Sequence, residues 1–238
     1  MGKRGPKPKG KVEIKWSPDF AYAIGLIVAD GSLSKDGRHI AFVSKDIDMI
    51  KTFLKCLKIE SKIGQKTSGY LSRNKCFVVQ VGDVLFYNFL LKIGLMPNKS
   101  KIIGKINIPD KYICDFLRGS FDGDGSFNSY WDPRWRSSHM FYLNFSSASL
   151  IHINWIKSEI MKKMKVCGHI SKSKRIGSIY NLRFAKKEAL VIIDKMYYNS
   201  NILYLKRKKD KIDKALNVEK KQQIKYNFTN KKARVLEQ

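Results

Sequence analysis

Gly25-Leu-Ile-Val-Ala-Asp30-Gly31-Ser32 and Gly119-Ser-Phe-Asp-Gly-Asp124-Gly125-Ser126 follow one pattern, G-x-x-x-x-D-G-S, and lie 94 residues apart (119 − 25). A motif that returns at the length of a small domain indicates that the chain is built from two related units. The sequence therefore predicts a first half over residues 16–104 and a second half over 105–238, which ends in a basic helix. A basic, flexible arm is predicted over residues 1–15.

Each copy of the motif lies at the end of an apolar segment that carries helix signals. Ser17 is a good N-cap and Pro18 fits the first helical position, so a helix is predicted from there to about Asp30. In the second copy a helical run begins at Pro109 and ends at Gly125, since glycine favours helix termination. Each motif is therefore expected to form the C-terminal end of a helix.

The segments after the two helices alternate between strand and helix periodicity in the same order. Strands are expected near residues 32–33, 39–43, 62–70 and 76–81 in the first half, and near 127–130, 140–145, 168–174 and 179–184 in the second. Helices are expected near 50–57, 84–93, 153–164 and 187–197. The predicted fold class is α+β, with two pseudo-symmetric αββαββα halves and antiparallel sheets.

Small residues recur at every fourth position of the first motif helix, at Ala21, Gly25 and Ala29. They give a flat face that a second helix can approach closely, and Gly119 takes the place of Gly25 in the second copy. Packing of the two motif helices would crowd the carboxylates of Asp30 and Asp124 together, where a divalent cation such as Mg²⁺ can neutralise both. The alternative is that each aspartate simply forms an Asp-Gly turn at the helix end.

The segments Ala23-Ile-Gly-Leu-Ile-Val-Ala-Asp-Gly31 and Leu117-Arg-Gly-Ser-Phe-Asp-Gly-Asp-Gly125 resemble the motif of the LAGLIDADG homing endonucleases, in the single-chain form that carries two copies. The resemblance covers nearly the whole chain, because matching elements are predicted after each copy. It implies an endonuclease that binds a long duplex DNA target across its sheets, which form a saddle, and makes a metal-dependent double-strand break across the minor groove. Mg²⁺ is the implied cofactor, and Mn²⁺ or Ca²⁺ is expected to substitute in binding.

The resemblance also implies which residues form the metal site. Asp30 and Asp124 match the acidic positions of the family's motif, and the adjoining Ala29 and Gly123 are expected to share in the site. Asp122, two positions earlier, has only a valine opposite it in the first copy and is not expected to bind metal.

Three lysines resemble the basic residues that, in this family, polarise water or steady the phosphate: Lys45, Lys99 and Lys206. Lys99 and Lys206 look like the equivalent positions of the two halves. The counterpart of Lys45 falls near Ser147, so the two active sites are expected to be unequal. In so basic a chain, the alternative for each lysine is a phosphate contact or a surface charge.

The charge of the chain indicates a polyanionic partner. Its 47 Lys and Arg residues against 20 Asp and Glu residues give a formal charge of +27, and duplex DNA is the partner we expect. A solvated basic surface, or one that lies on anionic lipid, is the alternative.

Two kinds of DNA contact are expected from the pattern of these residues. In Tyr180-Asn-Leu-Arg-Phe184 the apolar side chains alternate with Asn181 and Arg183, which would face the open side of a sheet and contact bases. The run from Lys206 to Lys209 has no alternation and suits phosphates. The basic residues expected to contact DNA are Lys66, Lys172, Lys174, Arg183, Arg207, Lys208 and Lys209.

Several other classes of protein are disfavoured. No apolar run approaches the ~20 residues that span a bilayer, no signal peptide is present, and the four cysteines have neither disulfide-framework nor zinc-site spacing. We therefore expect an intracellular monomer, in a prokaryotic cytoplasm or an organelle, with no membrane partner and no small-molecule substrate. The alternative function is a maturase or transcription regulator of the same fold that binds DNA or RNA without cleavage.

Overall fold

The computed structural model describes residues 10–68, 74–135, 137–173 and 178–236. Most of the predicted N-terminal arm and Lys174 lie outside these residues. The end of the predicted arm belongs to the first half instead, because Val12 is buried and the Lys11 and Val12 amides donate hydrogen bonds to Asp83 Oδ2 at 2.6 and 2.9 Å. No helix in the described ranges is long and apolar enough to cross a membrane.

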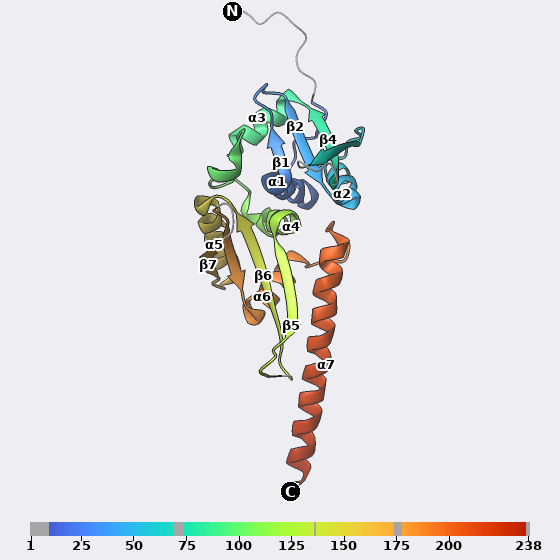
Figure 1. The fold of residues 1–238 in the computed structure, drawn as a ribbon, viewed down its shortest axis with the longest axis vertical. Helices are drawn as coiled ribbons and strands as arrows, with labels where there is room; N and C mark the ends of the chain where they lie inside the picture. Colours follow the sequence, from blue (N-terminus) through green and yellow to red (C-terminus); the bar gives the residue numbers. More distant parts are fainter. Residues whose placement is uncertain (1–9, 69–73, 136, 174–177, 237–238) are drawn as a thin grey trace, which may run out of the picture.

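The chain folds into two αββαββα halves, as the sequence predicts. The first half contains α1 (Pro18–Asp30), β1 (Gly31–Leu33), β2 (His39–Ser44), α2 (Ile47–Leu57), β3 (Gly64–Ser68), β4 (Asn74–Gly82) and α3 (Val84–Lys92). The second contains α4 (Ile113–Asp124), β5 (Ser126–Trp131), β6 (His139–Ser147), α5 (Leu150–Met164), β7 (His169–Lys172), β8 (Tyr180–Phe184) and α6 (Lys186–Met196). A long helix, α7 (Lys206–Leu236), follows and runs beside β5 (Figure 1).

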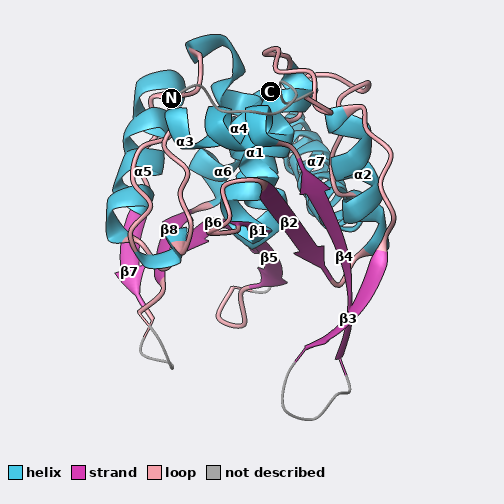
Figure 2. Cartoon of the chain, turned by 90° about the horizontal axis from the view of Figure 1, so that it is seen from above, coloured by secondary structure: helices cyan, strands magenta, loops and turns pink. Residues whose placement is uncertain are grey.

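Each half has one antiparallel four-stranded sheet with the same topology. The strand orders are β1-β2-β4-β3 and β5-β6-β8-β7. Figure 2 shows the helices gathered on one side of both sheets, with the strands on the other side. The opposite faces of the sheets are therefore open, as in the predicted saddle.

Side-chain caps explain where several helices begin. Ser17 Oγ accepts a hydrogen bond from the Phe20 amide at 3.1 Å, and Asp83 Oδ1 accepts one from the Phe86 amide at 2.9 Å. Such caps satisfy amides of the first helical turn that have no partner within the helix.

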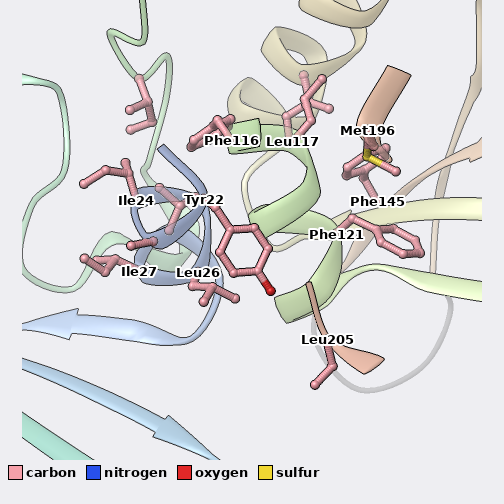
Figure 3. Packing of buried hydrophobic residues seen from close by; sticks show 14 of the residues in the cluster. Tyr22, Ile24, Leu26, Ile27, Phe116, Leu117, Phe121, Phe145, Met196 and Leu205 are labelled. Atoms are coloured by element: carbon pink, nitrogen blue, oxygen red, sulfur yellow. The ribbon is translucent and has the colours of Figure 1, made fainter. Parts of the chain in front are cut away.

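The halves meet through α1 and α4, which pack closely because glycine faces glycine. A Cβ atom built on Gly25 would lie 2.3 Å from the Phe116 carbonyl oxygen, and one on Gly119 would lie 2.1 Å from the Tyr22 carbonyl oxygen. Ala21 is also fully buried. Figure 3 shows the apolar side chains that surround this contact, with Tyr22 directed toward α4. The contact fixes how the C-terminal ends of the two helices lie relative to each other.

Candidate active site

The motif aspartates lie at the paired C-terminal ends of α1 and α4. A Cβ atom built on Gly123 would lie 2.3 Å from the Ala29 Cβ atom and 3.3 Å from Asp30 Oδ2. The residues that precede the two aspartates are therefore in contact across the helix pair. Asp30 is half-buried and Asp124 is exposed, so both carboxylates lie at a surface.

The electrostatic environment disfavours two free negative charges at this place. Burial, and then the negative charge of Asp124, raise the pKa of Asp30 to about 6, although Lys208, Lys99 and Arg207 act to lower it. Burial also raises the pKa of Asp124, against the opposing effect of Lys99 and Lys208. A bound cation would relieve this cost, because it stabilises the charged form of both groups.

Lys99 lies directly beside the aspartates. It begins a 3-10 turn, Lys99–Lys101, and only 6% of it is exposed. Its Nζ atom donates a long hydrogen bond of 3.4 Å to the Ala29 carbonyl oxygen. Burial lowers the pKa of Lys99, whereas Asp124 and Asp30 act in the opposite direction.

Lys208, and not Lys206, occupies the equivalent place in the second half. Lys206 is exposed, whereas Lys208 is 7% exposed and lies next to the end of α4. Lys208 Nζ donates hydrogen bonds to the carbonyl oxygens of Phe121, Gly123 and Gly125 at 2.6, 3.1 and 2.6 Å. The prediction of Lys206 as the paired lysine is corrected, and so is the prediction of Lys208 as a phosphate contact.

Arg207 and Lys209, which flank Lys208 in α7, form ion pairs within the protein. Arg207 Nε forms an ion pair with Asp46 Oδ2 at 3.0 Å, which ties α7 to the first half. Lys209 pairs with Asp213 on the next turn. Arg207 remains more than half exposed, so it can still contact a ligand.

Lys45 is exposed at the end of β2, and its counterpart is Ala148 rather than Ser147. The match follows from the helix caps: the Asp46 amide donates to Ser44 Oγ at 3.0 Å, and the Ser149 amide donates to Ser147 Oγ at 3.1 Å. Ser44 thus corresponds to Ser147. Alanine therefore stands opposite lysine, and the inequality of the two active sites stays a prediction.

A cavity of about 230 Å³ lies between Lys99 and the second-half sheet. Ala29, Lys99 and Asp124 line one side of it, and Ser146, Ser147 and Ala148 line another. The cavity offers room beside the carboxylates for a ligand or for water.

Asp122 is buried inside the second half, away from solvent. Its Oδ2 atom accepts hydrogen bonds of 2.8 Å from the Tyr22 hydroxyl and from the Leu205 amide. Burial raises the pKa of Asp122 to about 6. The side chain therefore joins α1, α4 and the segment before α7, a structural role that agrees with its exclusion from the metal site.

The donor atoms at the helix ends suit a hard divalent cation. In the described ranges no three His, Cys, Asp or Glu side chains cluster as metal ligands, so a metal would rest on Asp30 and Asp124 together with main-chain oxygens. The Ala29 and Gly123 carbonyl oxygens already attract the lysine ammonium groups. Oxygen donors of this kind fit Mg²⁺, Mn²⁺ or Ca²⁺.

The second-half sheet places both residues that were predicted to contact bases, Asn181 and Arg183, on its open face. Leu182 and Phe184 are buried against the core, which leaves Asn181 half-buried and Arg183 exposed on the other side. The prediction that Lys172 contacts DNA from the open face is corrected. Lys172 pairs with Tyr180 in the strand register, on the helix side of the sheet, and its Nζ atom lies 5.9 Å from the centre of the Tyr180 ring. In the first half, Lys66 is exposed on β3.

The sequence is similar to two archaeal proteins, over parts of their length. No protein-family model matches the sequence. Two proteins of Methanocaldococcus jannaschii are similar: DNA-directed RNA polymerase subunit Rpo1C is 29% identical over 132 residues, and an uncharacterised protein is 27% identical over 183 residues. The matches cover 53% and 72% of this chain, and the chain spans only 15% and 58% of the two relatives.

The solved structures that match cover most of the chain. Full-length WhiA from Thermatoga maritima has a TM-score of 0.55 at 16% identity, over 93% of this chain and 70% of that one. The meganuclease I-SmaMI bound to uncleavable DNA has a TM-score of 0.56 at 15% identity, over 92% and 93% of the two chains. The homing endonuclease I-WcaI, bound to its DNA recognition sequence, has a TM-score of 0.52 at 15% identity, over 81% and 89%.

The chain has the LAGLIDADG homing endonuclease fold. Proteins of this fold include DNA-bound homing endonucleases and WhiA, whose N-terminal domain is described as a LAGLIDADG domain. One I-DmoI variant was solved with its target DNA in the presence of manganese.

The position of Lys208 in this LAGLIDADG fold could have been found from helical spacing. The buried residues at the start of α7 follow the period of a helix: Leu205, Lys208, Ile212 and Ala215. This spacing places Lys208 on the apolar stripe, whereas Lys206 falls off it.

The raised pKa of Asp30 predicts how metal-free stability depends on pH. The pKa of Asp30 is higher in the folded protein than in the unfolded chain. Its contribution to stability is therefore fully present below the pKa of the unfolded chain and is lost as the pH rises through about 6. In EDTA at pH 7.5, the free energy of unfolding of Asp30→Asn should therefore exceed that of wild type by about 1–2 kcal/mol, after allowance for solvent screening. Urea denaturation measures this difference. The gain should vanish near pH 4, and Asp210→Asn, an exposed substitution, should show no gain. A less stable Asp30→Asn protein at pH 7.5 would contradict the electrostatic account.

The two buried lysines should differ in their effect on stability. Lys208→Met removes the hydrogen bonds to three carbonyl oxygens, of which that of Phe121 keeps the Gly125 amide as a donor, and should lower the free energy of unfolding by about 2 kcal/mol. Lys99→Met removes one long hydrogen bond and should cost clearly less. Urea denaturation of both variants, with the exposed Lys206→Met as control, tests this order. Equal losses for Lys206→Met and Lys208→Met would show that the assignment of Lys208 is wrong.

Proposed function

We propose that the chain is a site-specific endonuclease that binds a long duplex DNA target as a monomer and makes a metal-dependent double-strand break across the minor groove. The observation that carries this proposal is the meeting of Asp30 and Asp124 at the ends of the glycine-packed helix pair, with a buried lysine on each side. The charge of +27 supports a polyanionic partner, and the open sheets offer it a surface.

The residues of the site have two proposed roles, which are to hold the metal and to position the phosphate. Asp30, Asp124 and the Ala29 and Gly123 carbonyl oxygens would hold divalent metal, which supplies activation of a water nucleophile and stabilisation of the leaving oxygen when bound. The Lys99 ammonium lies close enough to both aspartates to affect their pKa values. It can therefore donate a hydrogen bond to a phosphate oxygen at the same place.

A second candidate function, DNA binding without cleavage, is favoured by one observation. Lys208 Nζ already donates to three carbonyl oxygens, including that of Gly123, so a lysine supplies positive charge where metal would bind. Within the described residues Lys99 makes one such bond, and it is long, which leaves the first-half carbonyl oxygen more accessible. Cleavage in magnesium separates the two functions.

The proposal is tested by capture of cut ends. A library of random duplexes is incubated with the full chain and Mg²⁺, and the new ends are sequenced. We expect breaks in both strands at a fixed offset within one family of sequences, and none with EDTA. The doubly substituted Asp30→Asn/Asp124→Asn chain, prepared in parallel, controls for contaminating nuclease. Ends no more frequent than in that control would overturn the proposed cleavage.

A further inference from the structure

The two sheets carry different side chains at matched positions of their open faces. The correspondence of Ser44 with Ser147 aligns β2 with β6, and the strand registers then align β4 with β8. At the centre of the first sheet these positions hold Ala41, Val43, Val78 and Gln80. At the same places the second sheet holds Asn144, Ser146, Asn181 and Arg183. At these four matched positions the first face is therefore mostly apolar and the second is entirely polar.

The apolar residues of the first face are not explained by the core. Ala41, Val43 and Val78 do not belong to the buried cluster that joins the helices to the sheet, and each is only half-buried. Their side chains have no hydrogen-bonding atom. In a major groove such side chains can contact the methyl group of thymine, but they cannot distinguish the donor and acceptor patterns of the other bases.

The polar residues of the second face are held in place by one another. Arg183 Nε donates to Asn144 Oδ1 at 3.1 Å, and Asn144 Nδ2 donates to Ser126 Oγ at 3.3 Å. Ser146 Oγ donates to Asn181 Oδ1 at 2.7 Å. These hydrogen bonds already hold the side chains in place, so less conformational entropy is lost when the side chains contact DNA.

Aromatic rings extend this ordered surface. The Arg183 guanidinium lies 5.3 Å from the centre of the Tyr142 ring, and Tyr142 stacks on Tyr130 with 6.2 Å between ring centres. A guanidinium supported on a ring face and on Asn144 is pre-organised, so less entropy is lost per hydrogen bond that it forms with a base.

We propose that the two half-sites of the DNA target are recognised with unequal stringency. The second-half sheet selects its half-site base by base through Asn181 and Arg183, and the buried Asn144 holds Arg183 in position. The first-half sheet tolerates substitutions in its half-site, because three of these four central positions, Ala41, Val43 and Val78, have no hydrogen-bonding side chain. This inference rests on the proposed function as far as duplex binding is concerned, and it does not require cleavage.

The consequence is an asymmetric target with one conserved side. Loss of a bidentate contact between arginine and guanine relaxes discrimination at that base pair by roughly tenfold to a hundredfold. Valine in contact with a thymine methyl group gives weaker selection, and DNA shape adds to both half-sites alike.

The test is selection of bound duplexes in EDTA, so that cleavage plays no part. The full chain is incubated with random-sequence duplexes, and the retained sequences are compared with those retained by two doubly substituted chains. Asn144→Ala/Arg183→Ala alters the ordered face, and Val43→Ala/Val78→Ala is the matched control at neighbouring positions of the first sheet. Circular dichroism of both variants checks that they fold.

We expect wild-type protein to enrich sequences that are conserved on one side of their centre and variable on the other. Asn144→Ala/Arg183→Ala should relax the conserved side by about tenfold or more at one or two base pairs, whereas the control should change discrimination at each base pair by clearly less, because only contacts with thymine methyl groups are lost. Equal conservation on both sides, or relaxation by the control of the same size, would overturn the inference and leave DNA binding intact. Absence of any enriched sequence would contradict the proposed function itself.

Discussion

Asp30→Asn and Asp124→Asn should each reduce double-strand cleavage by roughly a thousandfold or more, while affinity for the target in EDTA changes little. Each substitution removes one of the two carboxylates that meet at the ends of α1 and α4, and asparagine cannot supply the charge that holds a divalent cation. Binding should survive, because a charge of +27 and two open sheets do not depend on these carboxylates.

The measurement compares cleavage rate with affinity on one captured target duplex. Asp122→Asn is not a suitable control, because Asp122 is buried in a structural hydrogen-bond network. Asp48→Asn, at an exposed position of α2, serves better and should cut at the wild-type rate. If either motif variant cuts the target in magnesium as fast as wild type, the assignment of the metal site is wrong.

Gly119→Ala should lower the free energy of unfolding by about 3 kcal/mol or more. The new methyl group would lie 2.1 Å from the Tyr22 carbonyl oxygen, and a backbone atom of a packed helix cannot move aside as a side chain can. The helix pair must separate, so the two aspartates should also lose their relative position. The folded fraction of Gly119→Ala should therefore cleave DNA poorly.

Urea denaturation followed by circular dichroism measures the stability loss. Gly104→Ala is the matched control, because its Cβ atom would lie 3.5 Å from Ile151 Cγ2, an ordinary contact distance. It should change stability by less than about 1 kcal/mol. Wild-type stability of Gly119→Ala would show that α1 and α4 do not pack as closely as described.

The fold was predictable because the repeat and the residue periodicities agree with each other. The G-x-x-x-x-D-G-S motif located both halves, and Ser17 and Pro18 located the start of α1 correctly. Gly25 and its counterpart Gly119 predict close helix packing, and a Cβ atom on either residue would clash with the backbone of the facing helix. Such features are local in sequence, so a single chain is enough to recognise them.

The errors arose where register depends on distant contacts. The run of basic residues from Lys206 to Lys209 does not show by itself which side chain is buried. Lys208 is buried because it lies on the apolar stripe of α7. Lys172 lies on the helix side because the β7–β8 pairing sets its register, and a shift of one residue reverses every side chain of a strand.

The central claim is that Asp30 and Asp124 together form a site that cuts both strands of one DNA target. The most direct measurement is incubation of a supercoiled plasmid that carries one captured target with the full wild-type chain. We predict a linear product in Mg²⁺, no product in EDTA, and one break position per strand. A plasmid that is retarded in the gel but stays supercoiled in Mg²⁺ would contradict the claim and show a DNA-binding protein without cleavage.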